Sequence, residues 1–160
     1  MAGVAPAIKL DDMSGFRVAV ISASWHKEIC EALVAGAHRA LESAQVKIEP
    51  VNYVPGSFEL PLAAQYALDS GFDAAVVLGV VVRGETPHFD YVCQGVTDGV
   101  MKVSLDRNKP IGFGVLTVDD IDQAKVRSGV PGSKEDKGFD ATVAALELLK
   151  LANGFAGNQG

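Results

Sequence analysis

FDAAVVLGVVV, residues 72–82, is the stretch that decides the fold of this chain. The run is almost wholly apolar and is bounded by Gly71 on one side and Arg83 on the other. A strand with one solvated face alternates apolar and polar side chains, whereas this run offers apolar side chains to both faces. It therefore predicts a central strand of a parallel sheet, with helices covering both sides.

The segments around this strand alternate between strand and helix patterns. Further strands are predicted by short apolar or alternating runs at 16–22, 46–54 and 110–118. Helices are predicted by apolar residues three or four apart and by their start and stop residues at 24–44, 58–71, 87–106, 119–128 and 137–152. This order predicts an α/β domain, a three-layer flavodoxin-like open sheet of four parallel strands in order 2-1-3-4 with helices on both faces.

One domain is expected from residue 16 to residue 160, because the chain holds no internal repeat and no linker long enough to separate two domains. Residues 1–15 contain nothing that marks a core, and we expect them to form an arm that orders only against a partner. A connector rich in glycine, proline and charge, SGVPGSKEDKG (128–138), precedes the final helix. The tail after residue 152 is expected to fray.

Charge and hydropathy restrict the partners of the chain. Its 160 residues carry a net charge of −6. An acidic chain has no general attraction for nucleic acid or for an anionic membrane, so a few local groups must hold any anionic ligand. No apolar run reaches the roughly 18–20 residues that a membrane span needs, and the start of the chain, MAGVAPAIKLDDMSG, shows no secretory signal. We therefore expect a cytoplasmic protein.

The cysteines and histidines show no pattern of a metal site. Cys30 and Cys93 lie far apart among apolar neighbours, which is typical of buried free thiols in a reducing compartment. His26, His38 and His88 have no ligand spacing with either cysteine, so we expect no metal.

The predicted strand order places a ligand crevice between strands 1 and 3. In an open parallel sheet, ligands bind beyond the carboxyl ends of the strands, where the strand order reverses. The segments that follow these ends are SASWHKE (22–28), PGSFELP (55–61) and RGETPH (83–88). We expect these three segments to meet in one crevice.

RGETPH (83–88) has the features of an anion site at a helix start. Thr86 can cap a helix, and Pro87 is favoured at its first position. The first backbone N–H groups of such a helix bind anions, phosphate above all, and Gly84 allows close approach of the ligand. Glu85 must then point away from the anion. Neither a P-loop nor a dinucleotide-binding glycine motif is present.

Three side chains near this crevice could take part in chemistry, and each also has an ordinary structural explanation. His88 carries an imidazole that could transfer a proton, or it could be a surface histidine at a helix start. Trp25 could stack on a planar ring or fill the core. Glu59 could accept hydrogen bonds from a ligand, or it could only favour the positive end of a helix dipole.

Three residues farther along the chain can be explained by structural roles alone. Arg127 and Lys137 flank the connector and look like solvated charges at helix ends. Phe113 stands between two glycines in the predicted strand 110–118, and we expect it in the core.

Five motifs, in order along the chain, resemble those of one enzyme family. They are VPGSFELP (54–61), GVVVRGETPHFDYV (79–92), GFGVLT (112–117), QAKVRSG (123–129) and DKG (136–138). Each motif is weak alone, but the ordered set is specific, and the resemblance extends from Phe16 to about Leu151. The chain resembles the 6,7-dimethyl-8-ribityllumazine synthases of riboflavin biosynthesis.

The resemblance implies the fold, the reaction and the absence of a cofactor. Members of the family have a flavodoxin-like four-stranded sheet. They are transferases that condense 5-amino-6-(D-ribitylamino)uracil with 3,4-dihydroxy-2-butanone 4-phosphate. Schiff-base formation, phosphate elimination, tautomerisation and ring closure then give the lumazine, and no metal or organic cofactor takes part.

The resemblance also assigns roles to residues of the expected crevice. Trp25 occupies the position of the aromatic residue that stacks on the pyrimidine ring, where many members have phenylalanine. Ser57 and Glu59 lie where the ring and the ribityl chain are hydrogen-bonded, and the backbone of Val81 and Val82 holds the pyrimidine edge.

Phosphate binding and proton transfer are assigned in the same way. Gly84, Glu85 and Thr86 correspond to the phosphate loop, and His88 corresponds to the proton-transfer histidine. The groups that a neighbouring subunit supplies correspond to Phe113, Arg127 and Lys137, with Arg127 binding the phosphate. The resemblance thus implies that Arg127 is not a solvated charge but binds the phosphate in the site of a neighbouring subunit.

The resemblance implies a homopentamer with active sites between subunits. Members that build shells of sixty subunits carry a compact G-x-K-x-G-N-K-G connector after the arginine, whereas SGVPGSKED separates Arg127 from Lys137 here. We therefore expect free pentamers that do not build shells. Two other functions fit the same crevice: a non-catalytic flavin or lumazine binder, which has no need of the phosphate clamp formed with Arg127, and a flavodoxin-type electron carrier, which would need a phosphate loop richer in serine and threonine after strand 1.

Overall fold

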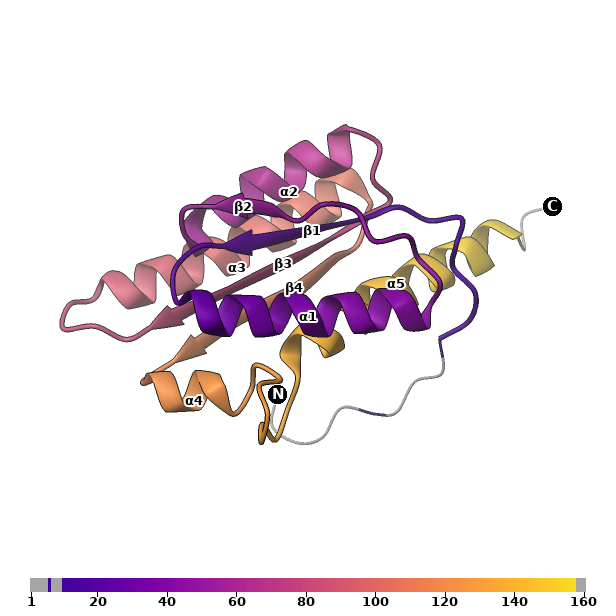
Figure 1. The fold of residues 1–160 in the computed structure, drawn as a ribbon. Helices are drawn as coiled ribbons and strands as arrows, with labels where there is room; N and C mark the ends of the chain where they lie inside the picture. The colour runs from indigo at the N-terminus through magenta and orange to yellow at the C-terminus, as the bar shows by residue number, and fades with distance from the viewer. Residues whose placement is uncertain (1–5, 7–9, 158–160) are drawn as a thin grey trace.

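The computed structural model describes residue 6 and residues 10–157, and in it four parallel strands form one sheet in the order β2-β1-β3-β4 (Figure 1). The strands are β1 (Val18–Ala23), β2 (Asn52–Val54), β3 (Ala74–Val82) and β4 (Ile111–Val118). The helices are α1 (Lys27–Ser43), the short 3-10 helix η1 (Ser57–Glu59), α2 (Leu60–Asp69), α3 (His88–Arg107), α4 (Ile121–Lys125) and α5 (Lys137–Gly157). The predicted α/β class and strand order are confirmed.

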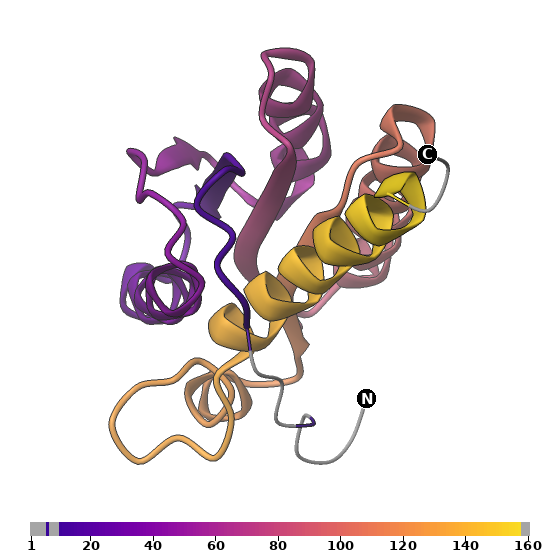
Figure 2. The same cartoon turned by 90° about the vertical axis from the view of Figure 1, so that its right-hand side faces the viewer.

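β3 is the centre of two apolar layers. Val76, Leu78 and Val80 pack into the core that α1 and α5 cover, while Ala75 and Val77 pack into the core under α2 and α3. Because side chains of a strand point alternately to its two faces, only a strand that is apolar throughout can serve both cores. Figure 2 looks along the sheet from its end, with helices on both sides of the strands.

Helix α5 approaches α1 and the sheet through glycine contacts. A Cβ added at Gly138 would overlap the backbone carbonyl of Leu33 in α1, and one added at Gly112 in β4 would overlap the carbonyl of Ala141 in α5. The backbones therefore touch at both points, and no side chain fits between them.

The structure shortens one predicted strand and one predicted helix. The strand predicted at 46–54 is only Asn52–Val54, and it lies at the edge of the sheet. The residues before it follow the turn that ends α1, where the N–H of Val46 donates to the carbonyl of Leu41 (2.9 Å). Apolar periodicity cannot separate such a packed turn from a strand. The helix predicted at 119–128 spans Ile121–Lys125, because the chain then turns into the connector.

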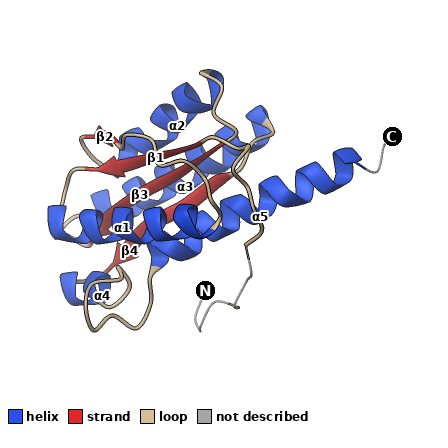
Figure 3. Ribbon diagram, turned by 45° about the vertical axis from the view of Figure 1, so that its right-hand side comes forward, coloured by secondary structure: helices blue, strands red, loops and turns tan. Residues whose placement is uncertain are grey.

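The final helix is longer than predicted. It ends at Gly157 and not near residue 152, and its last residues, 151–157, are exposed. Figure 3 shows this end of α5 projecting beyond the sheet. Asn153 and Gly154 resembled a stop signal in the sequence, but no proline follows them to end the helix.

Part of the predicted N-terminal arm contacts the domain. The side chain of Met13 is buried, its N–H donates to the carbonyl of Ala44 (2.8 Å), and Leu10 packs against the same core. Asp11 also forms an ion pair with Lys150 of α5 (2.8 Å). Residues 1–5 and 7–9 lie outside the described part, so an arm that orders against a partner stays a prediction.

Both cysteines are free thiols. Cys30 is buried, and burial raises the pKa of its thiol, while Cys93 is only half-buried, against the prediction that both are buried. Within the described ranges, no group of three or more His, Cys, Asp or Glu side chains is arranged to hold a metal ion. No helix in that part of the chain has the length and apolar character to span a membrane.

We expect two of the glycines of α5, Gly138 and Gly154, to respond oppositely to alanine. Gly138→Ala should lower the free energy of unfolding by about 1–3 kcal/mol, because the added methyl group has no room against α1. Gly154→Ala is the matched control: nothing lies within 4 Å of its added Cβ, and it should raise the free energy by up to about 1 kcal/mol. Urea denaturation at one fixed protein concentration measures both. Equal effects of the two substitutions would contradict the close contact between α1 and α5.

Candidate active site

The carboxyl ends of the strands open into a cavity of about 350 Å³. In Figure 1 the arrowheads of β1, β3 and β4 point to the end of the sheet where α1 and α3 begin. The cavity is lined by Trp25, His26, Gly56, Ser57, Phe58, Glu59, Val80, Val81, Val82, His88 and Val92. Each of the three predicted segments contributes to this lining, RGETPH only through His88, and the end of β3 and Val92 of α3 complete it. The predicted meeting of the three segments is therefore confirmed.

The floor of the cavity depends on a glycine in the central strand. A Cβ added at Gly79 would lie 2.5 Å from Ser57 Oγ and 3.4 Å from Leu60 Cδ1. Glycine at this position therefore lets η1 and the start of α2 lie directly on β3. The same contact brings Ser57 beneath the cavity, beside the backbone of the strand that ends at Val82.

Ser57 lines this cavity and carries a buried hydroxyl. The residue is 7% exposed, and its Oγ has no hydrogen-bond partner among the described residues. A buried polar group without a partner costs about 1–3 kcal/mol. A ligand hydroxyl or N–H group in the cavity would supply the missing partner.

Glu59 closes the loop that carries Ser57. Its Oε2 accepts a hydrogen bond from the N–H of Gly56 (2.9 Å), three residues earlier, as in a capping box. The residue is exposed and lines the cavity. Glu59 therefore has the structural role that was expected at a helix start. The same residue also lines the cavity in which a ligand would lie.

Trp25 is not in the core. Its side chain is 68% exposed and lies against Gly56, where an added Cβ would come within 3.5 Å of its Cδ1. The carbonyl of Trp25 accepts a hydrogen bond from the Cys30 thiol (3.2 Å), which ties it to the first turn of α1. The indole is thus an exposed wall of the cavity, and this geometry leaves room for stacking on a ring.

His26 was missed as a site residue in the sequence. It precedes α1 with φ of 54° and ψ of 61°, in the left-handed region that residues other than glycine rarely adopt. Such strained residues concentrate at functional sites. The only sequence signal was its place beside Trp25 after a strand end, because a positive φ cannot be read from a histidine.

His88 begins α3, and its side chain lines the cavity. Its backbone N–H points to the Thr86 hydroxyl at 3.4 Å, and Pro87, not Thr86, is the residue that immediately precedes the helix. The predicted helix start was therefore one residue early. Gly84, Glu85 and Thr86 are exposed and do not line the cavity, and nothing lies within 4 Å of a Cβ added at Gly84.

Arg83 holds the loop that follows β3. No role was expected for this residue from the sequence. Its Nε donates to Asp119 Oδ1 after β4 (2.8 Å), and its Nη1 lies 3.6 Å from Asp90 Oδ1 in the first turn of α3. The guanidinium also stacks 4.3 Å from the ring centre of Phe89. The hydrogen bond to Asp119 raises the pKa of Arg83. Arg83 thus joins the end of β4 to the turn of α3 that carries His88.

Arg127 and Lys137 lie together, away from the lining of the cavity. Arg127 Nη1 donates to the carbonyl of Gln123 (2.9 Å), and its Nε is 3.6 Å from Glu135. Lys137 Nζ is 3.1 Å from Glu135 and 3.4 Å from Asp140. Burial lowers the pKa of Lys137, but these carboxylates outweigh it and the net pKa is raised. The two cations are half-buried and paired, unlike the solvated charges that the residues alone suggested.

The prediction that Phe113 lies in the core is wrong. Its side chain is 41% exposed, although Val115, two residues along the same face of β4, is buried. β4 is an edge strand, so the helices cover only part of its face. Edge position depends on strand order and could not be read from the pattern GFGVLT.

Comparison with known proteins identifies the family. The family model described as 6,7-dimethyl-8-ribityllumazine synthase matches residues 15–153. The chain belongs to the 6,7-dimethyl-8-ribityllumazine synthase family. Proteins of that name from a Nocardioides species and from Kineococcus radiotolerans are 54% and 52% identical to it, covering 89% and 94% of this chain and 88% and 93% of theirs. The homologue from Micrococcus luteus is 56% identical over 87% of this chain and 86% of its own.

These comparisons confirm the predicted family and favour an enzyme over a non-catalytic binder, because the relatives carry the name of a synthase. The family match does not by itself test the predicted roles of individual residues. The fold brings Trp25, Ser57, Glu59, Val81 and Val82 around one cavity together with His88. It keeps Phe113, Arg127 and Lys137 out of that lining.

Removal of the Ser57 hydroxyl should weaken ligand binding without weakening the fold. We expect Ser57→Ala to raise the Kd for 6,7-dimethyl-8-ribityllumazine about two- to tenfold, the loss of one hydrogen bond, with an equal or higher free energy of unfolding. Quenching of the fluorescence of Trp25, the single tryptophan, reports binding.

Ser24→Ala is the matched control, because the Ser24 hydroxyl donates to the carbonyl of Val54 (2.8 Å) outside the lining of this cavity. It should leave the Kd unchanged. An unchanged Kd for Ser57→Ala would remove Ser57 from the binding site, and a lack of quenching in the wild type would remove Trp25.

Proposed function

We propose that this chain condenses 5-amino-6-(D-ribitylamino)uracil with 3,4-dihydroxy-2-butanone 4-phosphate to give 6,7-dimethyl-8-ribityllumazine and phosphate. The observation that carries the proposal is the cavity itself, which joins an exposed indole, an unsatisfied buried hydroxyl, a carboxylate and an imidazole at the strand ends. A planar, hydroxyl-bearing substrate needs a stacking surface and polar partners. A multistep condensation needs a group that moves protons.

The pyrimidine substrate is proposed to lie between Trp25 and the ends of β3. The indole stacks on the ring, and the backbone of Val81 and Val82 binds its edge. The Ser57 hydroxyl donates or accepts hydrogen bonds, and the Glu59 carboxylate accepts them from hydroxyl or N–H groups of the ring and the ribityl chain. All five residues line the cavity, which supports this arrangement.

The phosphate of the second substrate is proposed to bind at Gly84, Glu85 and Thr86. The first backbone N–H groups of a helix of 20 residues, α3, lie next to this loop and favour an anion. The open space at Gly84 admits the phosphate, and the carboxylate of Glu85 must turn outward.

His88 is proposed to carry protons between the substrates. Schiff-base formation, phosphate elimination and ring closure each require proton transfer, and none requires a metal or an organic cofactor. His88 directly follows the proposed phosphate loop and Pro87 in sequence and lines the cavity, which supports a role between the two substrates.

The active site is proposed to be shared between subunits of a homopentamer, with Phe113, Arg127 and Lys137 supplied by the neighbour and Arg127 binding the phosphate. Exposed apolar side chains support assembly, since large apolar patches mark interfaces. Among them are Phe58, Leu62, Tyr66, Tyr91, Met101, Leu105 and Phe113. The long SGVPGSKED connector favours free pentamers over shells, and a cytoplasmic location, favoured by the two free thiols, stays a prediction.

Replacement of His88 tests the proton carrier. We expect His88→Ala to lower kcat roughly 10- to 100-fold without abolishing turnover, because general acid–base catalysis is lost while the positioning of the two substrates remains. Lumazine absorbance follows the reaction. His88→Gln is the control, since glutamine keeps hydrogen-bonding groups but cannot take up or release a proton near neutral pH, and it should be as slow as alanine. An unchanged kcat in His88→Ala would remove His88 from the mechanism.

Mixing of two impaired variants tests the shared site. Arg127→Ala alone should mainly raise KM for the phosphate substrate, because it removes half of the phosphate site. When Arg127→Ala and His88→Ala chains are refolded together in equal amounts, about a quarter of the sites in a mixed ring should combine an intact His88 with an intact Arg127 of the neighbour. Activity should then rise above that of either variant. No gain in assemblies shown by mass to be mixed would argue against the shared site.

A further inference from the structure

Asp136, the residue before Lys137, sits in a cradle made by two glycines. A Cβ added at Gly36 of α1 or at Gly129 of the connector would overlap the Asp136 carboxylate. Gly129 also has a φ of 81°, which a side chain would strain. The carboxylate therefore lies directly on the surface of α1, with the connector wrapped over it.

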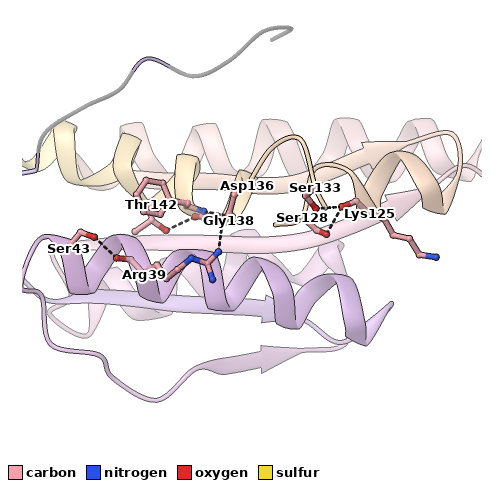
Figure 4. Close-up of polar contacts among 9 residues, drawn as sticks. Arg39, Ser43, Lys125, Ser128, Ser133, Asp136, Gly138 and Thr142 are labelled. Carbon is pink, nitrogen blue, oxygen red and sulfur yellow. Dashed lines mark hydrogen bonds and ion pairs between the residues drawn. The ribbon is translucent and has the colours of Figure 1, made fainter. Parts of the chain in front are cut away.

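Two further contacts hold this carboxylate. Arg39 of α1 forms an ion pair with Asp136 Oδ2 and reaches it across the gap between α1 and the connector (Figure 4). Asp136 Oδ1 accepts the N–H of Phe139 (3.0 Å), which caps the start of α5. One side chain thus joins three parts of the chain: α1, the connector and α5.

Asp136 also lies in the short pairing that sets Arg127 beside Lys137. Ser128 and Asp136 form an antiparallel bridge, and the N–H of Lys137 donates to the carbonyl of Arg127 (2.9 Å). On the other side of the bridge, the N–H of Gly129 donates to the carbonyl of Glu135 (3.1 Å). The two cations are therefore neighbours across the bridge, and Glu135 contacts both.

The two ends of the connector are fixed to different elements. At its start, the hydroxyls of Ser128 and Ser133 donate to the carbonyl of Lys125 in α4 (3.0 and 2.7 Å). At its end, Asp136 and Gly138 lie against α1, the latter on the backbone of Leu33. Figure 4 shows both attachments, with Arg39 reaching from α1 to Asp136.

We propose that Asp136, held by Arg39 and by the Gly36–Gly129 cradle, is a positioning residue that presents the phosphate-binding Arg127 together with Lys137 as one pair of cations. This inference rests on the proposed function for the role of that pair. Asp136 touches no reacting atom; it fixes the connector to α1, and the connector fixes the two cations.

Neutralisation of the ion pair tests the proposal in two ways. Asp136→Asn keeps the size and the capping oxygen but loses the charge, and Arg39→Gln removes its partner. Each should raise KM for 3,4-dihydroxy-2-butanone 4-phosphate about three- to tenfold, with KM for the pyrimidine substrate within about twofold of wild type. In hydrogen–deuterium exchange, the amides of Gly129, Glu135 and Lys137 should exchange faster, and those of β3 should not change.

The chain offers a matched control pair. Arg17 and Glu49 have exposed side-chain fractions of 52% and 21%, against 51% and 24% for Arg39 and Asp136. Arg17→Gln and Glu49→Gln should leave both KM values and the exchange of the connector unchanged.

A substitution on α1 separates positioning from loss of charge. Gly36→Ala should raise KM for the phosphate substrate in the wild-type background, because its methyl group displaces the Asp136 carboxylate. In an Asp136→Ala background, where no side-chain atom beyond Cβ remains to be displaced, Gly36→Ala should add nothing further. Additive effects in the double variant would contradict the cradle.

The outcomes distinguish this inference from the proposed function. If the wild type makes no lumazine, the proposed function fails, and the exchange data alone decide whether Asp136 anchors the connector. If the wild type is active and Asp136→Asn changes neither KM nor exchange, Asp136 is not a positioning residue. Faster exchange with an unchanged KM would also overturn the proposal, because the anchor would then be structural only.

Discussion

The burial of β3 on both faces is the constraint on which the rest of the structure depends. A strand with apolar side chains on both faces requires one helical layer over Val76 and Leu78 and another under Ala75 and Val77. Parallel neighbours need crossover helices, and these helices return the chain so that every strand ends at the same edge. The cavity lies at that edge, so its position follows from the hydrophobicity of a single strand.

Helix α1 serves both halves of the proposed site. At its start, Trp25 and His26 form a wall of the cavity. In its middle, Gly36 and Arg39 hold the Asp136 end of the connector. Because the helix is rigid, a shift of one end also moves the other end. The cavity wall of a subunit is therefore positioned by the same helix as the two cations that the subunit is proposed to supply to its neighbour.

The sequence predicted those features that repeat along the chain or follow from strand order. The apolar run at 72–82 was enough for the central strand, and topology was enough to bring His88 near Trp25. Features that depend on tertiary contacts could not be predicted. Phe113 is exposed because β4 is an edge strand. His26 has a left-handed backbone that its side chain does not encode, and Arg83 acts through Asp119, a residue distant in sequence.

Glu135 contacts both Arg127 and Lys137, so these two cations already have an anion before any phosphate arrives. A phosphate group in the proposed site would bind by exchange with this carboxylate. The binding free energy of phosphate is then the difference between its own interaction with the two cations and the interaction with Glu135 that it replaces. In the proposed site, such an internal competitor would favour release of the phosphate product, because Glu135 would take its place beside the two cations.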